Sequence, residues 1–173
     1  MARVTLISAN PDRELAAIRR AVAAFEPVTD EPSVITTLQR YAADGAGVEL
    51  LDLVGHSGRH GFLRLGEWIL DDAPQTAATF DALLRPILEQ LGVRAIRLLG
   101  CSTAMSARGW AAITAIGRAS RCRVFGTRRR VGHQDYRAEG FVSDDALSGT
   151  PSTLTRLVGR PDQRRSEIRA RTT

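Results

Sequence analysis

The segment VELLDLVGHSG, residues 48–58, decides the fold. Its first seven residues are mostly apolar, which is typical of a strand buried on both faces of a parallel sheet. The segment AIRLLGCS, residues 95–102, has the same arrangement: an apolar run leads directly into a glycine. We therefore expect two central parallel strands, over 48–54 and 95–99, each followed by a glycine and one reactive side chain, His56 or Cys101.

The flanking segments alternate between strand patterns and helix patterns. Apolar periodicity predicts strands over 3–8 and 122–126, a short strand near Val28, and a hairpin over 62–70. It predicts helices over about 12–25, 34–44, 80–91 with a kink at Pro86, and 103–119, and an exposed hairpin-like segment over 128–140. This alternation predicts an α/β three-layer sandwich with a mainly parallel sheet. We expect one domain over 1–158 and an Arg-rich flexible tail over 159–173.

The composition excludes several classes of protein. The chain has 173 residues, of which 43% are hydrophobic and 25% charged, so it is globular rather than disordered. It contains no apolar run of the roughly 20 residues that a membrane span requires. Two cysteines do not make a disulfide framework, and the N-terminus enters a strand pattern at once. We therefore expect a cytoplasmic protein without a signal peptide or membrane association.

The charge is unevenly distributed along the chain. All 24 basic residues are arginine; residues 1–100 carry a net charge of −3 and residues 101–173 one of +8. A basic half is compatible with a polyanion partner. The exclusive use of arginine and the high alanine content can also reflect the base composition of the genome, and we consider this the better explanation of the basic charge. Binding of nucleic acid or another polyanion is therefore not expected.

His56 and Cys101 together suggest nucleophilic catalysis. Both follow central parallel strands, and sites in such sheets lie at the carboxyl ends of the strands. A thiol attacks as a thiolate, which a helix beginning directly after Cys101 would favour. Cys101 would then be the nucleophile and His56 the general base and acid, with no cofactor. Backbone amides of Ser57, Gly58 and Cys101 are candidate donors to the oxyanion.

The order of these motifs resembles the caspase-like (clan CD) cysteine peptidases, in which His ends one central strand and Cys ends the next. The segments LDLVGHSG and IRLLGCS are most similar to bacterial CHAT-type members and to the autoprocessing protease domains of bacterial toxins. The likeness covers about residues 4–141, with its core over 51–104. Many members have glycine directly after His, whereas this chain has Ser57 before Gly58.

The resemblance implies a metal-independent endopeptidase that cleaves a protein substrate or itself. A partner protein or a dimer would complete the substrate groove of so short a domain. The residue preference of the pocket does not transfer by motif: Asp135 or Asp144 would suit a basic substrate residue, and Arg128 to Arg130 an acidic one. Trp110, on the helix after Cys101, is a further candidate for the pocket wall.

Four alternatives remain. The chain is a catalytically silent caspase-like module that binds a partner, or a basic α/β domain that binds a polyanion. In a third, Ser57 is the nucleophile of a serine hydrolase, although that motif needs glycine two residues later, where Arg59 stands, and a helix directly after it. In the fourth, zinc binds among the residues with ligating side chains, but their spacing is not that of a structural zinc site. Those residues are His56, His60, Cys101, Cys122 and His133.

Overall fold

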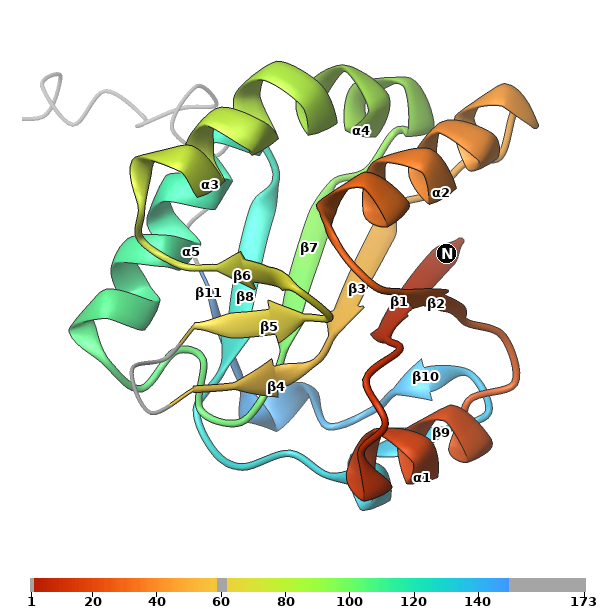
Figure 1. The fold of residues 1–173 in the computed structure, drawn as a ribbon, viewed down its shortest axis with the longest axis vertical. Coiled ribbons are helices and arrows are strands. Elements are labelled where there is room, and N and C mark those ends of the chain that lie inside the picture. Colours follow the sequence, from red (N-terminus) through yellow and green to blue (C-terminus); the bar gives the residue numbers. More distant parts are fainter. Residues whose placement is uncertain (1, 59–61, 150–173) are drawn as a thin grey trace, which may run out of the picture.

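The computed structural model describes residues 2–58 and 62–149, which form an α/β fold around a six-stranded sheet (Figure 1). In spatial order the strands are β11 (Leu147–Gly149), β8 (Arg123–Thr127), β7 (Ala95–Leu99), β3 (Leu50–Val54), β1 (Arg3–Ser8) and β2 (Glu26–Val28). All neighbours are parallel except β11, which runs antiparallel to β8. The predicted α/β class and mainly parallel sheet are confirmed.

Most of the helices cover one face of this sheet. The helical segments are α1 (Arg13–Ala21), α2 (Glu31–Ala43), α3 (Pro74–Thr79), the π-helical turn η1 (Phe80–Leu84), α4 (Arg85–Leu91) and α5 (Ala107–Ser120). From α2, α4 and α5, the side chains of Leu38, Leu88 and Ile113 join one buried cluster. Leu53 of β3 and Leu98 of β7 belong to the same cluster, so alternate positions of the central strands face these helices.

The opposite face is covered by α1 and a small two-stranded sheet, β9 (Tyr136–Arg137) and β10 (Gly140–Phe141). Leu15 of α1 and Phe141 pack in a second buried cluster with Val54 and Leu99, the last residues of β3 and β7. Side chains that continue this alternation beyond the two strands therefore lie on the α1 side. This is the side on which the candidate catalytic residues are found.

Helix α1 begins where the sequence indicates and ends earlier. The Asp12 carboxylate accepts hydrogen bonds from the backbone N–H groups of Glu14 and Leu15, which caps the helix. The helix ends at Ala21, four residues before the predicted end, because the backbone at Val22 is extended and the chain then enters β2.

The helix predicted over 80–91 is longer and irregular. It begins at Pro74 and contains the π turn η1, in which the Arg85 N–H donates to the Phe80 carbonyl. Pro86 has no N–H to donate, so the turn before it accommodates the missing hydrogen bond and α4 follows.

The predicted hairpin is present as β5 (Leu63–Leu65) and β6 (Trp68–Leu70), and β4 (His56–Ser57) adds a third strand to it. Gly66 adopts a left-handed conformation (φ 60°) in the hairpin turn, and a Cβ there would lie 1.8 Å from the Thr29 carbonyl oxygen. Trp68 stacks on Phe80, which fixes the small sheet against the helical layer.

The segment after β8 is a hairpin, as predicted, but it is not exposed throughout. Two short 3-10 turns, η2 (His133–Asp135) and η3 (Asp144–Ala146), flank β9 and β10. Tyr136 and Phe141 are both 1% exposed and their rings contact edge to face, so the expectation of exposure over 128–140 is wrong for Tyr136. Their packing against α1 buries them.

The domain boundary at 158 and the tail over 159–173 lie outside the described residues. In the part of the chain that the structure describes, no helix has the length and apolar character needed to cross a membrane.

Candidate active site

His56 and Cys101 follow neighbouring strands of the sheet. β3 and β7 pair in parallel with Val54 opposite Leu99, and each candidate residue lies two positions beyond this pair. The pairing continues past the strands, because the Gly55 N–H donates to the Leu99 carbonyl at 3.2 Å. Neighbouring strands lie about 4.8 Å apart. The structure thus brings the two strand ends side by side, which is the condition that a dyad of His56 and Cys101 requires.

Ser57 and the two glycines hold the strand ends together. The Ser57 hydroxyl donates to the backbone carbonyl of Cys101. A Cβ on Gly100 would lie 3.2 Å from both the Ser57 Cβ and the Gly55 carbonyl oxygen, and a Cβ on Gly55 would lie 2.1 Å from the backbone oxygen of Arg64. Gly55 therefore requires glycine for this close backbone approach, and the space at Gly100 is tight. The contact of Ser57 with Cys101, and the hairpin that follows it, do not resemble the strand-to-helix turn of a serine nucleophile.

His56 has an acidic neighbour that the sequence analysis did not identify. Its Nε2 lies 3.3 Å from Asp12 Oδ1, while Asp12 also caps α1. Hydrogen bonds from backbone N–H groups, that of Leu15 above all, and the nearby His56 ring lower the pKa of Asp12 below its ordinary value. Asp12 is therefore ionised near neutral pH and positioned to orient the imidazole.

Cys101 is half-buried, and its thiol donates to the backbone carbonyl of Val131 at 3.5 Å. Val131 belongs to the same buried cluster as Leu15 of α1. His56 and Cys101 therefore both contact groups on the α1 side of the sheet. In this conformation the thiol is directed at that carbonyl as a hydrogen-bond donor.

The prediction of a helix directly after Cys101 is wrong. Ser102 is left-handed (φ 60°), and its N–H donates to the Arg129 carbonyl. The Thr103 N–H then donates to the Thr127 hydroxyl, and α5 starts only after Ser106, its N-cap. Since a helix dipole acts mainly within its first turn, α5 gives Cys101 little of the stabilisation expected for a thiolate.

One of the predicted oxyanion donors, the Gly58 N–H, already has a hydrogen-bond acceptor within the chain. The Gly58 N–H donates to the Phe62 carbonyl at 3.2 Å. Ser57 contributes its hydroxyl to Cys101 as described above. The roles of the Ser57, Gly58 and Cys101 amides toward a substrate stay predictions.

The predicted pocket residues lie in three different settings. Asp135 is buried and accepts hydrogen bonds from the Arg129 guanidinium, the Gly132 N–H and the Ser143 hydroxyl. The Arg128 guanidinium donates to the Asp145 carbonyl, while Trp110 on α5 is 38% exposed. Asp135 and Arg128 thus have structural partners within the segment, and a role for them in substrate recognition stays a prediction.

A buried ion pair lies beneath the strand ends. Asp52 of β3 and Arg97 of β7 are in register, and two Arg97 nitrogens each lie 2.7 Å from an Asp52 oxygen. Arg97 also contacts Asp144, which places that predicted pocket residue in the same network.

Burial raises the pKa of the Tyr136 phenol well above its ordinary value, and its hydroxyl has no partner among the described residues.

Within residues 2–58 and 62–149, no three His, Cys, Asp or Glu side chains gather closely enough to hold a metal ion. His60, one of the zinc candidates, lies outside these residues. The thiol of Cys122 is buried and donates to the Val93 carbonyl at 3.3 Å, and burial raises its pKa. It is therefore the unreactive cysteine of the two.

Comparison of the chain with models of protein families, with curated proteins and with solved structures gave no match. The functional interpretation therefore depends on the geometry of the site and on the motifs themselves.

Proposed function

We propose that the protein is a cysteine endopeptidase in which Cys101 is the nucleophile and His56 the general base and acid. The observation that supports this proposal is the position of the two residues: each lies two residues beyond a register pair of adjacent parallel strands, and each contacts groups on the α1 side. The carboxyl ends of such strands are where α/β proteins place their sites. Asp12 serves as a positioning residue for the imidazole.

The reaction follows from these roles. His56 takes the thiol proton, and Sγ attacks the carbonyl carbon of the scissile peptide bond. The C–N bond then breaks, His56 returns the proton to the departing amine, and a thioester remains on Cys101. Water, deprotonated by His56, hydrolyses the thioester to a carboxylate and restores the thiol.

The present conformation is a resting one. The thiol donates to the Val131 carbonyl, so it must turn from that oxygen toward the imidazole before it loses its proton. The segment around Val131 would move aside when a substrate enters.

The finer features of the proposal come from the family resemblance. They are a caspase-like version of the fold and a protein substrate or self-cleavage. A cytoplasmic location is proposed from the two cysteines, and a second copy or partner that completes the substrate groove from the short length of the domain. The six-stranded, mainly parallel sheet is compatible with this fold.

The test is labelling with a peptidyl acyloxymethyl ketone, which is an acyl-type probe for catalytic cysteines. Wild type is expected to be labelled and Cys101→Ala to remain unlabelled. Cys122→Ala is the matched control, because it removes the buried thiol and leaves Cys101 in place. His56→Ala is expected to lose most of the labelling, since the thiol then lacks its base.

Labelling that survives Cys101→Ala would refute Cys101 as the nucleophile. Equal labelling of wild type and His56→Ala would show a merely accessible thiol and refute the dyad. A folded wild-type protein that no such probe labels would instead support the catalytically silent interaction module.

A further inference from the structure

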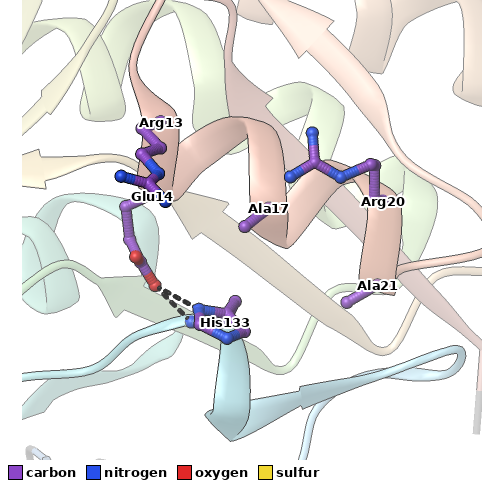
Figure 2. Close-up of a pocket in the computed structure, with 6 residues that line it drawn as sticks. All are labelled: Arg13, Glu14, Ala17, Arg20, Ala21 and His133. Atoms are coloured by element: carbon purple, nitrogen blue, oxygen red, sulfur yellow. Dashed lines mark hydrogen bonds and ion pairs between the residues drawn. The ribbon is translucent and has the colours of Figure 1, made fainter.

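The outer side of α1 carries a groove that the proposed peptidase reaction does not use. The groove has a volume of about 470 Å³. Its lining residues are Arg13, Glu14, Ala17, Arg20, Ala21 and His133. Figure 2 shows the two arginines along one side, the Glu14–His133 contact on the other and the two alanines between them.

The two arginines share one side of the helix. Arg13 and Arg20 are seven residues apart, which is close to two turns and about 10.5 Å along the axis. Ala17 lies between them and presents only a methyl group, so a ligand can approach the helix closely there. Both guanidinium groups can therefore reach one bound group.

Neither guanidinium has a hydrogen-bond acceptor or acidic partner among the described residues. Arg19 of the same helix, by contrast, donates to the Ser8 carbonyl at 2.6 Å, and Arg129 pairs with Asp135 at 2.7 Å. The charges of Arg13 and Arg20 are thus available to a ligand from solution. Both side chains are exposed, so neither has lost its hydration to a buried position.

The acidic residue of the lining does not cancel these charges, because it faces the other side. Glu14 Oε1 accepts from the His133 backbone N–H and lies 3.0 Å from its ring Nδ1. Hydrogen bonds from the His133 backbone and ring lower the pKa of Glu14 below its ordinary value. Glu14 is therefore ionised and engaged with His133.

We propose that this groove binds a small phosphate monoester, with Arg13 and Arg20 holding the phosphate. A phosphate dianion has three terminal oxygens and so accepts from two guanidinium groups at once, whereas one carboxylate is satisfied by one arginine. The volume lies within the usual range for small-molecule sites and exceeds what phosphate alone would fill. The organic part would lie over Ala17 and Ala21, toward His133. This site does not depend on the peptidase proposal.

Isothermal titration calorimetry at low ionic strength tests the site, with phosphoserine, serine and inorganic phosphate as probes. Phosphoserine is expected to bind saturably with one site, serine not at all, and phosphate more weakly than phosphoserine. The double variant Arg13→Gln/Arg20→Gln is expected to lose at least about tenfold in affinity, since it removes both charge-assisted contacts.

Two variants separate a built groove from general positive charge. Arg118→Gln removes an exposed arginine of α5 that has no partner among the described residues, and it is expected to bind phosphoserine like wild type. Ala17→Leu keeps every charge and fills the floor of the groove, and it is expected to lose binding.

Absence of saturable phosphoserine binding would overturn the proposal. So would an equal loss in the Arg118→Gln and double variants, or full binding by Ala17→Leu, because each of these results indicates diffuse attraction rather than this groove.

Discussion

Replacement of Asp135 by Asn tests whether one buried carboxylate holds the segment over Cys101. The Asp135 side chain is 5% exposed and accepts from Arg129 at 2.7 Å, from the Gly132 N–H at 2.9 Å and from the Ser143 hydroxyl at 2.7 Å. Val131, whose carbonyl accepts from the Cys101 thiol, lies inside the segment that these bonds fix. The substitution keeps the size of the side chain and removes its charge.

The expected loss of stability follows from these contacts. The asparagine NH₂ must face one of the three donors, so at least one hydrogen bond to a charged acceptor is lost, at about 1.5–3 kcal/mol. The Arg129 side chain is 44% exposed, so its ion pair contributes at most about 1 kcal/mol. We therefore expect Asp135→Asn to lower the free energy of unfolding by about 2–4 kcal/mol at neutral pH.

The loss should depend on pH in a defined direction. Burial alone would raise the pKa of Asp135, but the bonds from Arg129, Gly132 and Ser143 outweigh it and lower the pKa. The folded protein thus binds this proton less readily than the unfolded chain, whose Asp pKa is about 3.9. The stabilisation is complete above that value and disappears as the pH falls through the folded-state pKa. The difference between wild type and Asp135→Asn should therefore shrink below about pH 4.

Urea unfolding at a series of pH values measures both effects. Asp145→Asn is the matched control, because that carboxylate is exposed and accepts no hydrogen bond among the described residues. In a Cys122→Ala background, alkylation of Cys101 by iodoacetamide should be faster in Asp135→Asn, since Val131 is no longer fixed. Equal stability of the two Asn variants, or a deficit independent of pH, would refute the energetic argument. A lower stability with unchanged alkylation would show that the segment does not protect the thiol.

Three further substitutions test the strand ends. Asp12→Asn keeps the helix cap and is expected to reduce the rate of probe labelling by no more than about fivefold. The reason is that the contact with the half-exposed His56 is worth at most about 1 kcal/mol. If the rate fell by several orders of magnitude while the unfolding curve stayed unchanged, Asp12 would have a stronger role than this. Gly55→Ala places a Cβ 2.1 Å from a backbone oxygen of β5 and should abolish labelling together with native-like circular dichroism in the near ultraviolet; full activity would contradict the packing. Arg97→Met removes the closer partner of the buried Asp52 and leaves only Arg3, whose Nε lies 3.8 Å from Asp52 Oδ2, so it should cost up to about 3–5 kcal/mol in urea unfolding. A loss below about 1 kcal/mol, on the scale of a surface pair, would contradict the burial of this pair.

The sequence predicted the central parallel strands because their signals are local. The runs that end in Val54 and Leu99 are mostly apolar, as in a sheet covered on both faces, and glycine follows each of them. The ion pair of Asp52 and Arg97 could also have been predicted from the sequence. Each lies three residues before the glycine that follows its strand, and parallel pairing of the two runs places them side by side.

The contacts of the site could not be predicted in the same way. Asp12 was recognised as a helix start, but its approach to His56 depends on where the start of α1 lies relative to the end of β3. The position of α5 was misjudged because Ser102 and Thr103 are as suitable for capping as Ser106, the residue that caps it. Hydrogen bonds from Ser102 and Thr103 to Arg129 and Thr127, far along the chain, prevent the helix from starting at those two residues. The spacing of apolar residues in the sequence does not indicate such bonds.

The hydrogen-bond partners of the arginines also change the interpretation of the charge pattern along the chain. The basic half of the sequence suggested where a polyanion would bind, yet Arg108, Arg128 and Arg129 of that half donate to acceptors of the chain itself. Arg13 and Arg20 lie in the half with net negative charge and have no such acceptor among the described residues. A guanidinium that already donates to a carboxylate or carbonyl has fewer free N–H groups for a ligand, whereas an unengaged one gives up only water. The arginines available to an anion are therefore decided by the fold, and a count along the chain does not identify them.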